Sequence, residues 1–487
     1  MIQIQLSEDD FQYDVYTLVK AFFPEEDVKV IIGIEETFQE EPKTLQVRYE
    51  SEKVTVIMTE QGTILEDKTI FFHSNERKEK KNQLKRLLYE QLSNVSGRQL
   101  PWGNLTGIRP IKIIMSMMEQ GKHSQEAKQV FRENYCISEE KANLAVEIAK
   151  RELEVLNTFP YKEGYSLYVG IPFCPTTCLY CSFTSYPIGI WKERTGEYLK
   201  ALYKELEYIA RRMQHKRLDS VYIGGGTPTT LSAEELNELL SFIREKFDCS
   251  SVKEFCVEAG RPDSITNEKL MALRNCGVER ISINPQTMND KTLQVIGRQH
   301  SVADIIRAYD MAVTAGFPTI NMDIILGLPG ENLQDLEHTL KEIEKLDPQN
   351  LTVHSLALKR AARLNIQKQS YTEDINAAPE EMMKLASEYA KNMGQLPYYL
   401  YRQKNMGGNL ENVGYTRNGH IGLYNILIME EKQTIMAAGA GAMTKNVLKT
   451  GDIIRVENVK DVANYISRVD EMIARKEEVF KSHEREL

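Results

Sequence analysis

Long hydrophobic runs are missing from this sequence of 487 residues, and so is any surplus of basic charge. No stretch approaches the ~18 apolar residues of a membrane-spanning helix, so we expect no membrane span. The 61 Lys and Arg residues are outnumbered by 70 Asp and Glu residues, which leaves a formal net charge of −9. Because nucleic acids and anionic membranes attract basic surfaces, we expect neither as a general partner.

A signal sequence and a disulfide framework are also absent from the pattern. The N-terminus, "MIQIQLSEDDFQYDVY", has acidic residues where a signal peptide has a basic patch and an apolar run. The seven cysteines, an odd number in a long chain, are typical of a reducing compartment. We therefore expect a cytoplasmic protein whose clustered cysteines bind metal or carry out redox chemistry.

The chain has no low-complexity tract and no internal repeat of fixed period beyond alternating strands and helices. Its hydrophobic pattern instead divides it into four segments. Residues 1–95 read as an N-terminal α+β domain, and residues 96–160 as a helical linker region. Residues 161–360 read as a barrel, and residues 361–487 as a C-terminal α+β extension that covers the substrate.

Short apolar runs alternate with helical stretches after Tyr161, and this rhythm predicts a parallel sheet with helices on its outer face. Six such units, rather than eight, predict an α/β fold with a partial (βα)6 TIM-like barrel. A barrel open along one side admits a large substrate. The expected strands are "SLYVGI" (166–171), "SVYIGGG" (220–226), "EFCVEAG" (254–260), "VERISINPQ" (278–286), "TINMDIILGLP" (319–329) and "NLTVHSL" (350–356).

Three cysteines with the spacing C-x3-C-x2-C, Cys174, Cys178 and Cys181, directly follow the first of these strands. In a parallel α/β barrel the loops after the strands form the active face. Structural zinc needs four ligands, and it would have to recruit a distant Cys249, Cys256 or His215. No fourth cysteine adjoins the three, and no histidine lies between residues 124 and 214.

Two other interpretations of these cysteines remain. Free cysteine packs as a small apolar residue, so all three could be core residues, although they stand in a proline-containing loop. Alternatively, three thiolates hold an iron-sulfur cluster. One iron would then lack a protein ligand and offer a place where a small molecule chelates.

The same spacing, with the aromatic Tyr180 just before the last cysteine, resembles the signature of the radical S-adenosylmethionine (SAM) enzymes. The resemblance implies a [4Fe-4S] cluster held by Cys174, Cys178 and Cys181. It also implies that the methionyl amino and carboxylate groups of SAM bind the open iron. The other cysteines, Cys136, Cys249, Cys256 and Cys276, are interpreted as core or incidental residues.

Five motifs in order extend this resemblance to one family. They are "SLYVGIPFC", "IGGGTPT", "VEAGRPDSI", "RISINPQTMNDKTLQVIGRQH" and "MDIILGLPGE". Together they resemble the oxygen-independent coproporphyrinogen III oxidase family. The segments "LPWGNLTGIRP", "CPTTCLYCSFTSYP" and "NLENVGY" are most similar to its coproporphyrinogen dehydrogenase branch, and that similarity covers essentially the whole chain.

Three polar residues, Glu258, Gln286 and Asp323, stand inside otherwise apolar strands. Burying such a group unpaired costs about 1–3 kcal/mol, so we expect each to have a partner, either in the protein or in a ligand. Arg298 could pair with a ligand carboxylate or form a surface salt bridge. By position, the family resemblance implies that SAM binds at Tyr168, Gly225, Gly226, Thr227, Glu258, Gln286, Arg298 and Asp323.

The resemblance implies a radical SAM oxidoreductase of anaerobic porphyrin and haem biosynthesis. Its expected reaction is the oxidative decarboxylation of two propionates of coproporphyrinogen III to vinyl groups, which gives protoporphyrinogen IX. The expected partners are this tetrapyrrole and an electron donor such as flavodoxin or ferredoxin.

Two positions depart from the family pattern. Phe183 stands where established oxidases have a further cysteine, and Gly170 stands where relatives commonly have histidine. The sequence C-x-F is shared with the haem-chaperone branch. The alternative function is therefore a haem-binding chaperone or another radical SAM protein that modifies tetrapyrroles.

The tyrosine-rich segment from Tyr398 to Tyr415 is the expected cover of the open barrel. It offers aromatic surface for stacking against a macrocycle, and Arg402 and Lys404 could meet its propionates. The alternative is an amphipathic connector without a role in binding.

Overall fold

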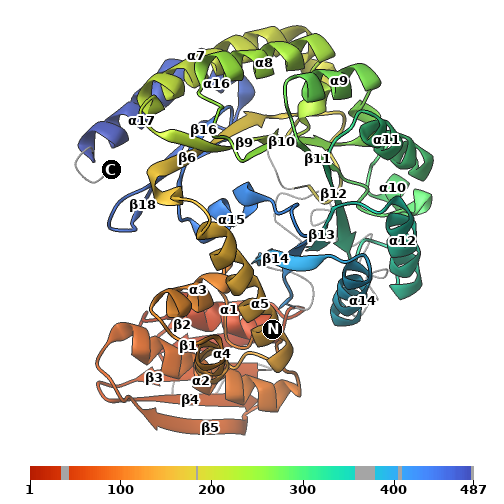
Figure 1. Cartoon of the computed structure of the whole chain (residues 1–487). Coiled ribbons are helices and arrows are strands. Elements are labelled where there is room, and N and C mark those ends of the chain that lie inside the picture. The colour runs from red at the N-terminus through yellow and green to blue at the C-terminus, as the bar shows by residue number, and fades with distance from the viewer. Residues whose placement is uncertain (35–42, 182–184, 357–378, 404–408, 484–487) are drawn as a thin grey trace. The chain divides into compact units, whose positions relative to one another are not determined.

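The computed structural model describes residues 1–34, 43–181, 185–356, 379–403 and 409–483. The chain forms two compact units (Figure 1). The first comprises Met1–Ala149 and Arg402–Glu411, and the second comprises Lys150–Tyr401 and Asn412–Leu487. These divisions do not coincide with the expected boundaries at 95, 160 and 360. Among the described helices, none has the length and apolar character needed to cross a membrane.

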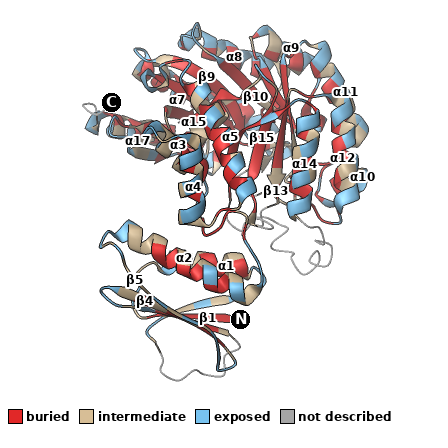
Figure 2. Cartoon of the chain, turned by 60° about the horizontal axis from the view of Figure 1, so that its bottom comes forward, coloured by how far each residue is buried: buried red, intermediate tan, exposed pale blue. Residues whose placement is uncertain are grey.

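The first unit contains a five-stranded sheet in the order β2-β1-β3-β4-β5. Strand β1 is parallel to β2 and β3, whereas β3, β4 and β5 form an antiparallel meander. Figure 2 shows α1 and α2 side by side over one face of this sheet. The strands are β1 (Ile2–Leu6), β2 (Val28–Ile32), β3 (Lys43–Tyr49), β4 (Lys53–Glu60) and β5 (Thr63–Phe71). The helices here are α1 (Gln12–Phe22), α2 (Arg77–Ser96), α3 (Ile111–Glu119), α4 (Ser124–Tyr135) and the first part of α5 (Glu139–Leu156), up to Ala149.

Two of the motifs noted above meet inside this first unit. Trp102, from "LPWGNLTGIRP", donates its indole N–H to Glu411 Oε2 at 2.6 Å, and Glu411 belongs to "NLENVGY". The other carboxylate oxygen accepts from Lys141 Nζ at 2.8 Å. All three side chains are buried, so each satisfies a polar group that would otherwise destabilise the interior.

The second unit contains the six expected parallel strands, and they lie side by side in chain order. Helices α7, α8, α9, α11 and α12 line the outer face of this curved sheet (Figure 1), which confirms the partial (βα)6 barrel. The strands are β6 (Gly164–Ile171), β9 (Arg217–Gly225), β10 (Glu254–Gly260), β11 (Arg280–Ile283), β12 (Thr319–Leu326) and β13 (Asn350–Ser355). The helices are α7 (Thr195–Met213), α8 (Ala233–Lys246), α9 (Asn267–Asn275), α11 (Val302–Thr314) and α12 (Leu333–Leu346).

Further strands extend both edges of the barrel sheet. Strand β16 (Thr434–Ala438) is a seventh parallel strand beside β6, and β17 (Met443–Val447) and β18 (Ile453–Glu457) follow it antiparallel. At the other edge β15 (Asn412–Thr416) and β14 (Leu396–Tyr401) add to β13. The sheet thus has eleven strands in the order β14-β15-β13-β12-β11-β10-β9-β6-β16-β17-β18, and its two edge strands do not pair with each other.

A short helix, α15 (Leu423–Glu430), lies inside the curve of this sheet (Figure 1). Its sequence "LYNILIME" is apolar on nearly every side, as is typical of a helix that is surrounded by protein. The backbone N–H of Tyr424 donates to Glu254 Oε2 at 2.6 Å, and Glu254 is the first residue of β10. Helix α15 therefore fills the interior near the amino-terminal ends of the strands and leaves the carboxyl ends for a site.

A buried ion pair attaches the end of the chain to the barrel. Lys476, on α17 (Val469–Ser482), lies 2.6 Å from Glu205 on α7, and both side chains have 0% exposure. Glu205 also accepts from Tyr465 at 2.5 Å and from the Gly439 backbone N–H at 2.9 Å. The carboxylate thus joins three parts of the C-terminal extension to one barrel helix.

Replacement of this lysine, K476M, should destabilise the second unit strongly, because it leaves the Glu205 carboxylate buried without its cation. Breaking one side of a buried pair typically costs about 3–5 kcal/mol. The measurement is the midpoint of urea-induced unfolding, followed by circular dichroism.

The matched control is K204M. Lys204 pairs with Asp470 between the same two helices, but both side chains are largely exposed, and exposed ion pairs are screened by solvent. K204M should therefore leave the midpoint nearly unchanged. Equal shifts in the two variants would contradict the importance of the buried pair.

Candidate metal-cofactor site

The three cysteines lie on one loop that follows β6, at the carboxyl end of the parallel strands. Cys174 ends the two-residue strand β7 (Phe173–Cys174), which pairs with β8 (Tyr186–Pro187). Cys178 is buried, whereas Cys174 and Cys181 are half-buried. The loop therefore holds one thiol in the interior and two with partial exposure, at the carboxyl end of the parallel strands.

The middle of the cysteine loop is attached to the segment after α10 (Asp290–Val295). The Leu179 backbone N–H donates to the Ile296 carbonyl at 3.0 Å. The Thr176 hydroxyl donates to the Gly297 carbonyl at 3.3 Å. These bonds join the loop after the first strand to the loop after the fourth.

The glycine turn at the end of β9 holds the start of the cysteine loop. The backbone N–H of Gly226 donates to the Ile171 carbonyl at 2.7 Å, and that of Thr227 donates to the Phe173 carbonyl at 2.6 Å. A Cβ atom at Gly226 would lie 2.5 Å from the Phe173 oxygen, so only glycine fits. The amides of Gly226 and Thr227 thus bind carbonyls at the start of the cysteine loop. The turn that places them there is made at Gly225, whose φ is +108°.

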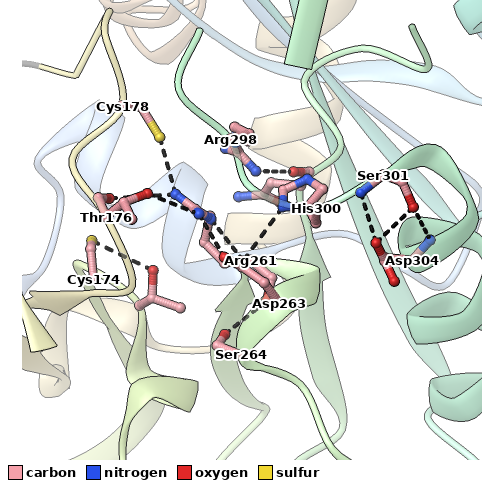
Figure 3. Close-up of polar contacts among 12 residues, drawn as sticks. Cys174, Thr176, Cys178, Arg261, Asp263, Ser264, Arg298, His300, Ser301 and Asp304 are labelled. Carbon is pink, nitrogen blue, oxygen red and sulfur yellow. Dashed lines mark hydrogen bonds and ion pairs between the residues drawn. The ribbon is translucent and has the colours of Figure 1, made fainter. Parts of the chain in front are cut away.

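Two side chains donate hydrogen bonds to the cysteine sulfurs. Thr227 Oγ1 lies 3.5 Å from Cys174 Sγ. Arg261 Nη1 lies 3.3 Å from Cys178 Sγ (Figure 3). Burial raises the pKa of the Cys174 thiol, and the Thr227 hydrogen bond opposes that rise. Both donors favour the thiolate, which is the form that binds metal.

A second group of polar side chains lies inside the barrel beyond the glycine turn. Glu258, on β10, accepts hydrogen bonds from the Tyr222 hydroxyl and from the Gly225 backbone. Burial and, to a lesser extent, the charge of Asp323 raise the pKa of Glu258, while the two hydrogen bonds and the His354 ring oppose the rise. The net result is a pKa of about 7. The two carboxylates are thus near enough to influence each other.

His354 connects Asp323 to the edge of the sheet. Its Nε2 lies 3.5 Å from Asp323 Oδ2, and its Nδ1 lies 3.3 Å from the Tyr401 hydroxyl. The three residues come from β12, β13 and β14. They form a chain of proton-carrying groups from the barrel interior to the edge strand β14.

Gln286 lies just after β11 in the left-handed conformation, with φ 68°, which is uncommon for a residue with a side chain. Its backbone N–H donates to the Asp323 carbonyl at 2.9 Å, and its carbonyl accepts from Ile325 at 3.0 Å. Its buried Oε1 has no hydrogen-bond partner among the residues that the structure describes. That amide oxygen is therefore available to a ligand donor.

Arg298 is buried and faces the aromatic residue of the cysteine motif. Its guanidinium donates to the Tyr180 hydroxyl at 2.8 Å and to the Asn284 carbonyl at 2.7 Å. Its Nε has no partner within the described ranges. The surface salt bridge considered for this residue is therefore wrong, because the side chain points inward.

Tyr168 belongs to a stack of three aromatic rings in the interior. Its ring centroid lies 6.2 Å from that of Tyr222 and 6.3 Å from that of Tyr424, and the latter two rings are 4.4 Å apart. Burial raises the pKa of the Tyr168 hydroxyl, so it stays neutral. The three stacked rings thus form an apolar layer in the interior next to Glu258, to which Tyr222 donates its hydroxyl hydrogen bond.

The residues present fit an iron-sulfur cluster with one open iron. Three thiols lie on one loop, and two of their sulfurs accept hydrogen bonds. Gln286 Oε1 is a buried acceptor and Arg298 Nε a buried donor, and neither has a hydrogen-bond partner among the described residues. No three Cys, His, Asp or Glu side chains in the described ranges converge closely enough to hold a single metal ion. A cluster does not require that convergence, because each thiolate binds a different iron.

Two of the expectations for this region lie outside the described residues, those for Phe183 and Lys404. A third, that Arg402 meets substrate propionates, is wrong. Arg402 is buried in the first unit, and its guanidinium donates to the carbonyls of Leu105, Asn409 and Leu410. Burial lowers its pKa to about 10, and its donors are committed to the backbone.

Sequence reasoning missed two residues of the site, Arg261 and His354. His354 stands inside the apolar strand "NLTVHSL", so the criterion that selected Glu258 and Asp323 would have selected it as well. Arg261 stands in "AGRPD", in a turn rather than a strand. Only the tertiary structure brings it to Cys178.

Comparison with known proteins gives one family model and several relatives. The model described as the radical SAM superfamily matches residues 168–343. The oxygen-independent coproporphyrinogen-III oxidase-like protein HemZ of Bacillus subtilis is 39% identical over 453 residues, and the match covers 90% of each chain.

Other similarities cover less of the chain. The heme chaperone HemW of Bacillus subtilis is 39% identical over 195 residues, which is 40% of this chain and 51% of the chaperone. Among solved structures, coproporphyrinogen III oxidase (HemN) from Escherichia coli matches with a TM-score of 0.53 and 22% identity. That match covers 66% of this chain and 72% of the other, and at this identity it shows the fold alone.

Replacement of any one of the three cysteines by serine, C174S, C178S or C181S, should prevent assembly of an intact cluster. A serine hydroxyl is a poor substitute for a thiolate ligand. The measurements are iron and sulfide per chain and the visible absorbance of anaerobically reconstituted protein. C249S is the control and should load fully. Normal loading of all three single variants would contradict the ligand assignment.

Proposed function

The chain belongs to the radical SAM superfamily, in the family of oxygen-independent coproporphyrinogen-III oxidase-like proteins, and we propose that it oxidatively decarboxylates coproporphyrinogen III. It is an enzyme of the radical SAM type, and its cofactors are a [4Fe-4S] cluster and SAM. The product would be protoporphyrinogen IX, formed by conversion of two propionates to vinyl groups in anaerobic porphyrin and haem biosynthesis.

The observation that carries this proposal is similarity over nearly the full length, 90% of both chains, to a relative that is named as oxidase-like. A sheet whose edge strands do not pair also suits a macrocyclic substrate, because a closed barrel of this size is filled by its own side chains. The partner is accordingly proposed to be a tetrapyrrole, and the electron donor a small protein such as flavodoxin or ferredoxin.

The cluster and SAM, when bound, supply a one-electron reductive cleavage that provides a hydrogen-abstracting radical. The chain's own residues have three tasks. Cys174, Cys178 and Cys181 would hold the cluster. Glu258 and Gln286 offer acceptors for the ammonium of SAM, and the stack around Tyr168 forms an apolar layer next to Glu258.

The reaction balances if each propionate loses one hydrogen atom, one carbon dioxide and one electron. The carbon-carbon bond to the carboxylate breaks, and a carbon-carbon double bond forms in the side chain. The hydrogen atom goes to the radical derived from SAM, and the electron goes to an acceptor.

The direct test is an anaerobic incubation of cluster-loaded protein with coproporphyrinogen III, SAM and a reductant. We expect 5'-deoxyadenosine and a product in which propionates have become vinyl groups, both measured by mass spectrometry. The C178S variant is the control without a cluster. Cluster-loaded protein that releases no carbon dioxide and forms no vinyl product would contradict the proposal.

A second candidate function, haem binding and transfer, is favoured by the relatives named as heme chaperones. The Bacillus subtilis chaperone is 39% identical to this chain across about half of its own length. The same protein preparation separates the two functions. A chaperone would bind haem tightly in a spectroscopic titration and form no vinyl product in the incubation.

SAM affinity should depend on pH through Glu258. Only the ionised carboxylate attracts the ammonium of SAM, and burial raises the pKa of Glu258 to about 7. Affinity should therefore fall as the pH decreases from about 8 to about 6, approaching tenfold per pH unit below the pKa. This affinity is measured by anaerobic calorimetric titration of cluster-loaded protein with SAM at each pH.

Two variants make the pH experiment specific. E258Q should bind SAM more weakly and without this pH dependence. Glu331 is also buried with a raised pKa, but its carboxylate accepts hydrogen bonds from Thr287 and Asn289 and is not among the expected SAM contacts, so E331Q should keep the wild-type profile. Retention of the profile in E258Q would show that another group titrates.

A further inference from the structure

Arg261 places a buried positive charge against the cysteine loop. It follows Gly260, whose φ of +45° turns the chain at the end of β10, and only 3% of the residue is exposed. Its Nη1 donates to Cys178 Sγ at 3.3 Å and to the Thr176 carbonyl at 3.4 Å, and its Nη2 donates to Thr176 Oγ1 at 3.1 Å. Figure 3 shows the side chain directed at the loop.

Asp263 holds this guanidinium from the other side. Its two carboxylate oxygens accept from Nε at 2.9 Å and from Nη2 at 2.7 Å, a bidentate pairing that fixes the plane of the guanidinium. Burial alone would raise the pKa of Asp263, but the nearby His300 ring and the hydrogen-bonded guanidinium of Arg261 outweigh it and hold the pKa well below its usual range. Asp263 is therefore ionised.

The pocket as a whole carries an excess of positive charge. Arg261 and Arg298 are two buried cations, and Asp263 is an anion that pairs with Arg261. His300 lies 3.4 Å from Asp263, and burial lowers its pKa, so it is neutral near pH 7. These four residues together therefore carry one net positive charge, which thiolates of the cysteine loop would balance.

This arrangement affects the two redox states of a cluster differently. Reduction adds one electron and hence one negative charge to a cluster already held by three thiolates. A cation and a hydrogen bond at a ligand sulfur stabilise the more negative state, and both are recognised determinants of cluster potentials. Because Arg261 is buried, water screens its charge weakly.

We propose that Arg261 raises the reduction potential of the cluster through its hydrogen bond to Cys178, and that Asp263 moderates this effect by balancing its charge. Arg261 is thus a positioning residue that acts through the ligand and touches no substrate. The step concerned is the entry of one electron from an external reductant into the cluster, without proton transfer. The proposal rests on the cofactor and is independent of the tetrapyrrole.

The test is a potentiometric titration of cluster-loaded protein with dithionite and mediators, without SAM or substrate, followed by electron paramagnetic resonance. R261Q removes the charge and the hydrogen bond, so at a fixed potential its ratio of reduced to oxidised cluster should fall about tenfold. For a one-electron couple this corresponds to a midpoint lower by about 59 mV. D263N removes the balancing charge and should move the midpoint in the opposite direction.

Two variants on helix α11 provide matched changes of charge. Arg307 and Asp304 pair with each other, and Arg307 is largely exposed, so R307Q and D304N should leave the midpoint unchanged. Iron and sulfide contents confirm equal loading of all samples. If R261Q does not assemble a cluster, the direction of the midpoint shift in D263N by itself tests the proposal.

The opposite signs of the two expected shifts distinguish electrostatic tuning from a purely structural role. A structural role would lower cluster content in both variants and leave the midpoint of the loaded fraction unchanged. The proposal would be overturned if R261Q had the same midpoint as R307Q. It would also be overturned if R261Q and D263N shifted the midpoint in the same direction, or if D263N did not raise it.

Discussion

Two backbone hydrogen bonds join the chain leaving β6 to the glycine turn at the end of β9, and the position of the cysteines depends on them. They run from Gly226 to Ile171 and from Thr227 to Phe173. They form only because Gly226 has no Cβ atom to meet the Phe173 oxygen. As a result the chain leaves the sheet with Cys174 beside Thr227, and the rest of the loop extends toward the turns after β10 and α10.

The charges around this loop divide into two regions with different chemistry. Arg261 and Arg298 face the thiols and Tyr180, whereas Glu258 and Asp323 face the barrel interior. SAM carries a sulfonium and an ammonium group, which suit the acidic interior. The cysteine thiolates and the carboxylate of SAM suit the side that carries Arg261 and Arg298. Because both regions are buried, these preferences are stronger than they would be in water.

The sequence was most informative where local pattern and tertiary structure agree. The six strands of the barrel follow from their apolar runs, and each ends close to the expected residue. The seventh parallel strand, β16, was missed because its five residues follow a stretch without the strand-helix rhythm. Its place beside β6 depends on pairing across about 270 residues, from Thr434 to Tyr165, which no local pattern records.

The interpretation of single polar residues was less complete. Glu258, Gln286 and Asp323 stand out because a polar group in an apolar strand needs a partner, and His354 meets the same criterion. Arg402 was misjudged because cation and tyrosine neighbours in sequence do not show which way a side chain points. Its guanidinium instead bonds backbone carbonyls in the first unit.

The sequence by itself determined the parallel barrel and the three clustered thiols, because hydrophobic period and cysteine spacing are local properties of the chain. Only the tertiary structure decided what surrounds those thiols. Arg261, Thr227 and Arg298 come from three different strand-end loops. Their meeting at one cysteine loop depends on the side-by-side pairing of parallel strands, which brings the carboxyl ends of distant segments to one edge.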